Sequence, residues 1–187
     1  KGENAEIQIP IEIEGKKVSS IGTGAFSGCS GLTGDLVIPE SVTSIEAYAF
    51  CNCSNLDGEL ILPKGIKRIE NGTFSGCSKL SGNLVIPDGV EYIGFDAFKG
   101  CAGFEGDLII PNSVIEFGES LDASTFQGCS GFDGKLVISD NITEIGSLMF
   151  EGCSRLKELV LPSKLESIGS GAFKRCRSLV CELVIPE

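Results

Sequence analysis

The nine cysteines are the side chains of this sequence that can take part in the widest range of reactions. Seven of them recur about every 24 residues. Cysteines ligate metals, form disulfides or act as nucleophiles. A zinc site needs paired Cys-x-x-Cys motifs or cysteine with histidine, and the chain has neither pattern and no histidine at all. The lack of histidine also removes Ser-His-Asp and Cys-His nucleophile pairs. We therefore expect no catalytic residue, no cofactor-binding residue and no metal site.

Ser-Lys pairs and carboxylate pairs are the remaining formal sources of catalysis. Glu116 with Glu119, or Asp140 with Glu144, would suit the acid and base of a glycosidase. The net charge of −11 offers a simpler explanation, because solvated acids are common on so acidic a surface. The same charge, with lysines and arginines scattered along the chain, argues against a nucleic-acid partner, since phosphate backbones need a basic surface.

The recurring cysteines belong to a longer repeat. A phenylalanine stands three residues before each of them, so the same sequence unit occurs seven times along the chain. Such a period is typical of solenoids, in which each copy must stack on its neighbours to bury its apolar face. The paired residues are Phe26 and Cys29, Phe50 and Cys53, Phe74 and Cys77, Phe98 and Cys101, Phe126 and Cys129, Phe150 and Cys153, and Phe173 and Cys176.

Two extended segments are expected in each unit. Leu36, Val37 and Ile38 alternate as a strand does, and Pro39 ends that strand because it lacks an N–H donor. The Val-x-x-Ile-Gly pattern of residues 18–22 predicts a second, brief extended segment closed by a glycine turn. Stacking the units then gives two narrow parallel sheets.

A short helical turn is expected between these segments. Ala25, Cys29 and Leu32 are spaced i, i+4 and i+7, which places them on one helical face. Glycine or asparagine precedes six of the repeated cysteines, and both residues readily take the left-handed φ of a helix C-terminus. Arg175 breaks that column, so we expect the last coil to be strained there or to end differently.

The stacked cysteines are predicted to form a buried column of free thiols that act as small hydrophobic residues. Copies at equivalent positions of parallel coils lie ~4.8 Å apart. Cys51 and Cys181 stand outside the column and are interpreted as incidental surface thiols, with pairing left open.

The repeat divides the chain into two parts. Residues 1–17 look like an incomplete repeat that forms an N-terminal cap, and residues 18–187 hold seven repeats, the fifth lengthened by an insertion near 119–122. The sequence stops in mid-coil after Pro186, so we expect the array to be truncated there. No run of ~18 or more apolar residues predicts a membrane-spanning helix.

The pattern Phe-x-Gly-Cys-Ser-x-Leu-x-Gly-x-Leu-x-Ile-Pro-x-x-Val-x-x-Ile-Gly occurs at residues 26–46, with Glu46 at the final glycine, and at 74–94. It resembles the BspA-like class of leucine-rich repeats over residues 7–187. The chain departs from the pattern at a few positions, namely Ser139 in place of proline and Thr73, Thr125 and Met149 in place of alanine.

The resemblance implies a leucine-rich repeat solenoid of α/β-type coils, with short parallel strands stacked into a curved sheet, a second short-strand sheet and short helical turns. It also implies a non-enzymatic protein-interaction module of a cell-surface or secreted protein, which adheres to a host surface or matrix protein or to another partner. Two alternatives stay open: a structural spacer that projects another domain from the cell surface, and, less favoured, a carbohydrate-active β-helix. The oligomeric state is open.

The outward residues of the Leu-x-Ile strands are the candidate contact site. An exposed aliphatic row flanked by acids is typical of a docking surface, although β-branched residues also favour strands for their own sake. The row consists of Val37, Ile61, Val85, Ile109, Val137 and Val160, with Asp35, Glu59 and Asp107 on the same side.

Overall fold

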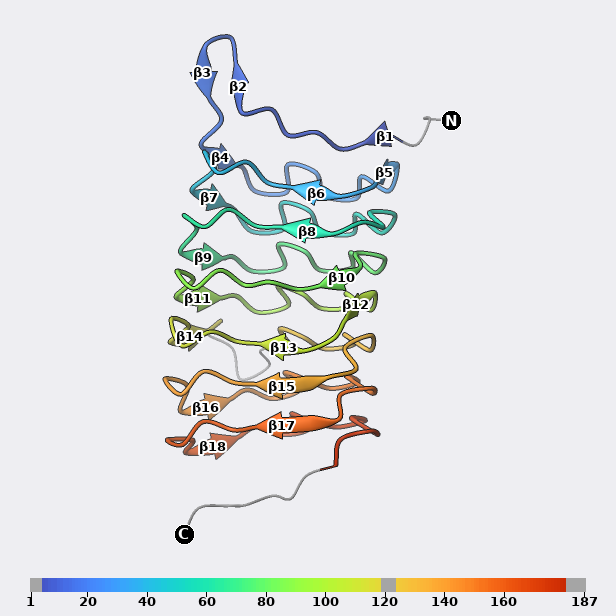
Figure 1. Ribbon diagram of the computed structural model, residues 1–187, viewed down its shortest axis with the longest axis vertical. Coiled ribbons are helices and arrows are strands. Elements are labelled where there is room, and N and C mark those ends of the chain that lie inside the picture. Colours follow the sequence, from blue (N-terminus) through green and yellow to red (C-terminus); the bar gives the residue numbers. More distant parts are fainter. Residues whose placement is uncertain (1–4, 119–123, 181–187) are drawn as a thin grey trace.

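The computed structural model describes residues 5–118 and 124–180, and these form a column of stacked coils (Figure 1). Each coil contributes short parallel strands, and the described residues contain no helix. The architecture is therefore the predicted repeat solenoid with parallel strands. The insertion expected near 119–122 lies outside the described residues, and the division into a cap and seven repeats stays a prediction.

One ladder of strands comes from the Val-x-x-Ile segments. Its parallel pairs follow the repeat, so that Ile21 lies beside Ile45 and Ile93 beside both Ile69 and Phe117. The pairing order is β4-β7, then β9-β11-β14, then β16-β18. The strands are β4 (Ser20–Ile21), β7 (Ser44–Ile45), β9 (Arg68–Ile69), β11 (Tyr92–Ile93), β14 (Glu116–Phe117), β16 (Glu144–Ile145) and β18 (Ser167–Ile168).

The second ladder comes from the Leu-x-Ile segments and is also parallel. Leu36 pairs with Leu60, and Leu136 pairs with both Leu108 and Leu159, so one full repeat separates each pair. The pairing order is β6-β8, then β13-β15-β17. The strands are β6 (Leu36–Val37), β8 (Leu60–Ile61), β13 (Leu108–Ile109), β15 (Lys135–Val137) and β17 (Glu158–Val160).

The remaining strands lie at one edge of the coils and at the N-terminal end. β1 (Ala5–Glu6) pairs with β5 (Leu32–Thr33), and β10 (Gly82–Asn83) pairs with β12 (Phe104–Glu105), both parallel. β2 (Glu12–Ile13) and β3 (Lys16–Lys17) form an antiparallel hairpin that projects beyond the stack (Figure 1). Glu14 and Gly15 close it with φ of 50° and 77°, the combination that a two-residue hairpin turn requires.

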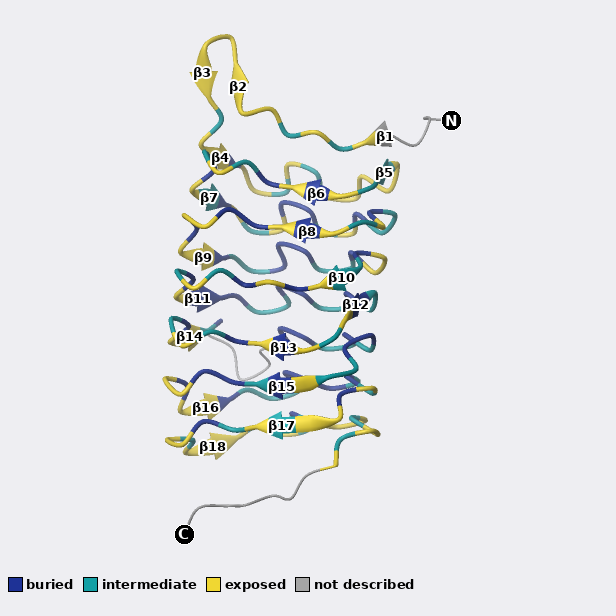
Figure 2. Ribbon diagram, viewed as in Figure 1, coloured by how far each residue is buried: buried dark blue, intermediate teal, exposed yellow. Residues whose placement is uncertain are grey.

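Stacked phenylalanines form the centre of the core. Successive rings from Phe26 to Phe173 lie nearly parallel, with centroids 5.1 to 5.8 Å apart. Buried leucines and isoleucines of the two ladders surround them, and the buried residues follow the column along its length (Figure 2). Each ring therefore gains its burial and its stacking from its own copy in the next coil.

The predicted helical turn is wrong. The segment from Ala25 to Cys29 is a series of turns, because alternate N–H groups donate to the next coil instead of to the carbonyl four residues back. The N–H of Phe26 donates to the Ala49 carbonyl at 2.7 Å, and the N–H of Gly28 donates to the Cys51 carbonyl at the same distance. These donors cannot also close an α-helical turn.

The expected left-handed turn before each cysteine is confirmed. Gly28 has φ of 74° and Asn52 has φ of 59°. Arg175 takes the same conformation with φ of 65°, so of the two expectations for this coil the strained turn is confirmed and the different ending is wrong. Stacking on the coil before it holds this residue in a region that is costly for a side chain with a Cβ.

Candidate functional site: the outer face of the Leu-x-Ile sheet

The outward side chains of the Leu-x-Ile segments form an aliphatic row on the surface of the stack. Val85 is 66% exposed, and Val37, Ile61, Ile109 and Val160 are each between 46% and 48% exposed. The strand alternation explains this, because the preceding leucines point into the core. Figure 2 shows the exposed and buried stretches side by side on these strands.

Val137 departs from the predicted row, because it is half-buried. It lies in β15, the central strand of its ladder, with β13 on one side and β17 on the other. The continuous exposed part of the aliphatic row therefore runs over four coils, from Val37 to Ile109.

Acidic residues stand beside the row as expected, and two of them also have a structural role. Asp35, Glu59 and Asp107 are all exposed. The Oδ1 of Asp35 accepts a hydrogen bond from the Glu59 N–H at 2.8 Å, and the Oδ1 of Asp107 accepts one from the Lys135 N–H at 2.8 Å. These carboxylates thus tie one coil to the next while their charge stays at the surface.

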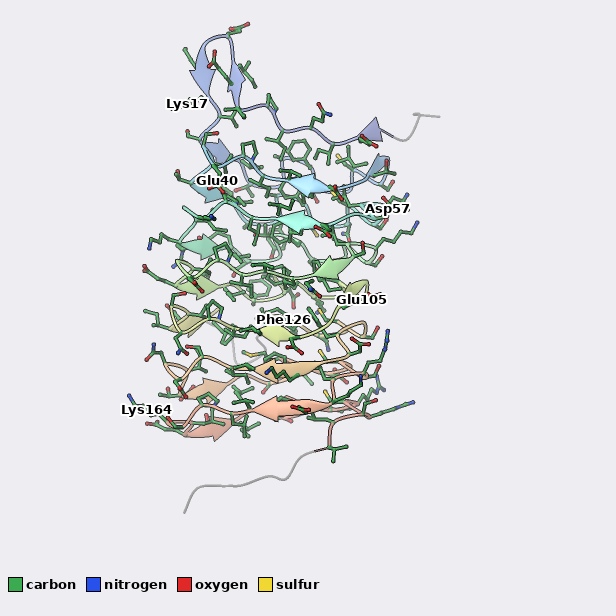
Figure 3. The ribbon with its side chains drawn as sticks, viewed as in Figure 1. Lys17, Glu40, Asp57, Glu105, Phe126 and Lys164 are labelled. Atoms are coloured by element: carbon green, nitrogen blue, oxygen red, sulfur yellow. The ribbon has the colours of Figure 1, made fainter. Side chains whose placement is uncertain are left out.

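A second line of polar residues on the other side of the row was missed from the sequence. Glu40 and Asp88 follow the strand-ending prolines and are exposed. The Oε2 of Glu40 accepts from the Lys64 N–H at 3.0 Å, so this line also links coils. Glu40 and Asp57 lie at opposite edges of the face, with β6 between them (Figure 3). The signal was a polar residue directly after the proline in each copy, or after Ser139 in the fifth.

Hollows accompany the row. β8 ends one part of the ladder and β13 begins the next, and residues 84–86 belong to neither. A hollow of about 600 Å³ lies along this break, with Val85, Asp88, Asp107 and Ile109 in its lining. Another, of about 630 Å³, lies between the N-terminal segment and the first coil and includes Asp35 and Val37.

The cysteine column is a set of inert thiols. Cys53, Cys77, Cys101, Cys129 and Cys153 are fully buried. Each donates its Sγ–H to the phenylalanine carbonyl of the coil before it, as Cys77 does to Phe50 at 3.0 Å. Sequence reasoning treated these residues as hydrophobic only and missed the hydrogen bond. Burial raises the pKa of the Cys101, Cys129 and Cys153 thiols, which disfavours the reactive thiolate.

The ends of the column differ from its middle. Cys29 is exposed and Cys176 is half-buried, so the expectation of seven buried thiols is reduced to five. Cys51, expected at the surface, is half-buried. All the described cysteines are free thiols, and Cys181 lies outside the described residues.

Asp140, one of the carboxylates considered for catalysis, has a structural role. Asp140 Oδ1 accepts a hydrogen bond from the Ser163 N–H at 3.1 Å, a link between coils, and Glu119 lies outside the described residues. Residues 5–118 and 124–180 contain no group of three acidic, cysteine or histidine side chains placed to hold a metal ion. Over the same ranges no helix is long and apolar enough to cross a membrane.

Parallel coils with stacked phenylalanine and leucine columns define a leucine-rich repeat protein. The family model described as "BspA type Leucine rich repeat region" matches in six copies, at residues 4–130 and 81–187. The chain belongs to this family. Leucine-rich repeat domains are in general non-enzymatic protein-interaction modules.

Three crystal structures are similar. A leucine-rich repeat protein from Bacteroides ovatus is 34% identical with a TM-score of 0.79, over 93% of this chain and 43% of that one. The T. pallidum leucine-rich repeat protein is 32% identical with a TM-score of 0.80, over 96% and 79%. A leucine-rich cell surface protein from Faecalibacterium prausnitzii is 28% identical with a TM-score of 0.60, over 88% and 50%. The chain thus spans less than half the Bacteroides protein and half the Faecalibacterium one. No curated protein matches it.

Proposed function

We propose that this domain binds a protein partner through the outer face of the Leu-x-Ile sheet, and that the binding serves adhesion at the cell surface. The observation that carries the proposal is the exposed aliphatic row from Val37 to Ile109. Contiguous apolar surface rimmed by polar groups is favourable to remove from water and is typical of contact sites. The description of the Faecalibacterium relative as a cell surface protein supports the location.

The competing explanation is that valine and isoleucine stand in the row only because β-branched residues favour strands. Threonine separates the two, because it keeps the branched shape and adds a hydroxyl. The test is the double variant Val85→Thr and Ile109→Thr, displayed on cells and offered a panel of host-surface and matrix proteins. The matched control is Ile115→Thr, since Ile115 is 60% exposed beside the other ladder.

Contact through the row predicts that the double variant captures its partner about tenfold less well, the effect of losing ~1.4 kcal/mol of binding free energy. The control is expected to capture as the parent does. Equal capture by the parent and a folded double variant would sink the proposal and leave the domain as a spacer.

A further inference from the structure

The surroundings of the row carry information about the partner. In the first four coils the eight flanking polar positions hold five carboxylates, one lysine and two asparagines, and all are exposed. They are Asp35, Glu40, Glu59, Asp88, Asp107, Lys64, Asn83 and Asn112. Ion pairs among the described residues join other groups, such as Lys67 with Glu91 and Arg155 with Asp133. Within residues 5–118 and 124–180, no ion pair reaches any of these five carboxylates. The face therefore presents net negative charge beside an apolar strip, with three carboxylates and no cation on the Asp35 side and two carboxylates with Lys64 on the Glu40 side.

The fifth coil interrupts the row. In the fifth coil the position of Asp107 is taken by Lys135, and the row residue beside it, Val137, is half-buried. The exposed aliphatic row is thus interrupted at this coil, while Asp140 in the same coil and Glu158 and Val160 in the next are exposed. The continuous apolar strip and the acids beside it share one footprint, four coils long.

The spacing along this footprint favours one kind of occupant. Paired strands lie ~4.8 Å apart, and the unpaired third coil makes three such steps a lower limit, so Val37 and Ile109 lie at least ~14 Å apart along the axis of the stack. An α-helix on that axis places residues i, i+3, i+7 and i+10 on one face within ~15 Å, because it rises 1.5 Å per residue. A strand on the same axis places a side chain on one face only every ~6.7 Å, so its side chains no longer match the coils after the first one.

The width of the footprint also suits a helix. Asp35 and Glu40 are five residues apart on an extended segment, which separates the two acidic lines by ~16 Å. A helix with its side chains is ~10–12 Å across, so it fits between them. Lysine or arginine on its flanks would lay an aliphatic stem over the row and reach the carboxylates with its charged end.

We infer that the face takes an amphipathic α-helix of the partner, with aliphatic residues at i, i+3, i+7 and i+10 and lysine or arginine on both flanks. The inference rests on the proposed function and names its partner's chemistry. The hollow at Val85 and Ile109 receives the largest aliphatic side chain. Charge complementarity speeds the encounter and selects the partner, and the apolar strip holds it.

The probe is a synthetic amphipathic peptide of about 18 residues with a leucine stripe flanked by lysine and arginine, titrated against the domain by fluorescence anisotropy. One control peptide has the same composition with the stripe scrambled, and another has glutamate in place of the basic residues. The protein variants are Val85→Thr with Ile109→Thr for the strip, Glu59→Gln with Asp88→Asn for the charge, and Ile115→Thr as the control.

The helical basic peptide is expected to bind at least about tenfold more tightly than either control peptide. The strip variant is expected to lose that advantage, and Ile115→Thr to keep it. The charge variant is expected to weaken binding about threefold to tenfold at ~0.05 M salt and much less at ~0.5 M, where charges are screened within a few ångström.

Equal binding of the scrambled peptide, or tight binding of the glutamate peptide, would overturn the inference. So would a strip variant that binds as the parent does. The two proposals fail separately: if partner capture on cells needs the row but the basic peptide does not bind, the proposed function stands and only the helix is wrong. If the peptide binds through the row but capture does not need it, adhesion is wrong.

Discussion

Raising the pH from about 7.5 to about 9.5 should destabilise this protein through its buried thiols. An unfolded cysteine titrates near 8.5. Burial raises the pKa of Cys101, Cys129 and Cys153, so the native state keeps these protons where the unfolded chain has lost them. The unfolded state then binds fewer protons, and stability falls as pH rises. One pH unit above 8.5, each thiol removes ~1.4 kcal/mol and the three together ~4 kcal/mol.

A loss of that size is a large part of the ~5–15 kcal/mol that stabilises a typical domain. Cys53 and Cys77 add less than two independent thiols, because the interaction between these neighbouring thiols lowers the pKa of Cys53 and raises that of Cys77. The assay is urea unfolding followed by circular dichroism at several pH values, with a reductant present. Reductant keeps disulfide formation from contributing to the transition.

Variants isolate the thiol effect from the titration of lysine and tyrosine. Cys101→Ala should flatten the pH dependence by ~1.4 kcal/mol at pH ~9.5, whatever it costs at neutral pH. Cys29→Ala is the matched control, because it removes an exposed thiol at the same repeat position. A parent protein whose stability is flat up to pH ~9.5, or a Cys101→Ala variant with the parent's slope, would refute the reasoning.

Three other outcomes are expected. In thiol labelling at neutral pH followed by mass spectrometry, the five buried cysteines should react more than ~100-fold more slowly than Cys29, since they react only after the coils open; equal rates would contradict the buried column. Gly131→Ala should cost ~1–3 kcal/mol in thermal unfolding, because a Cβ there would collide with the carbonyls of Phe104 and Ala102. Gly31→Ala, with nothing within 4 Å of the added carbon, should be neutral or stabilising by ~0.5 kcal/mol. Asp107→Ala should lower stability by ~1 kcal/mol through loss of the bond to the Lys135 N–H, while Asp107→Asn keeps an acceptor and should cost less; equal melting temperatures for the two would contradict that role.

The column of coils could be predicted from the sequence because the repeat fixes the register. Once Leu36 and Leu60 occupy the same position of successive units, parallel pairing one repeat apart follows, as the structure confirms. The helical turn could not be predicted reliably. An i, i+4, i+7 pattern records which side chains face the core, and a turn-rich segment of a coil meets the same requirement. The choice between a helical turn and a turn-rich coil depends on which carbonyls accept from the backbone N–H groups. Here those carbonyls lie one repeat away.

The candidate site, too, could be predicted from the sequence only in part. Strand alternation was enough to place Val37, Ile61, Val85 and Ile109 outside. The break in the ladder was not predictable, because residues 84–86 read Leu-Val-Ile, the same letters as residues 36–38, and only the latter begin a strand. Pairing with neighbouring coils decides strand formation here, and local propensity does not.

Stacking constrains the inside of this solenoid much more than the outside. An inward phenylalanine meets its own copy 5.1 to 5.8 Å away on each side, so a change in one coil disturbs two contacts. Outward positions carry no such demand. Those of the Val-x-x-Ile ladder accordingly vary and are largely polar: Ser20, Ser44, Arg68, Glu116, Glu144 and Ser167, whereas Tyr92 at the same repeat position is buried.

The outward positions of the Leu-x-Ile segments have the same kind of strand geometry, and yet each described copy is valine or isoleucine. Strand formation does not require this, because the neighbouring ladder forms with serine, arginine and glutamate at its outward positions. Core packing does not require it either, since Val85 is 66% exposed. Within one chain, then, two sheets built by the same stacking rule differ on their outer faces. Contact with an apolar partner would account for that difference.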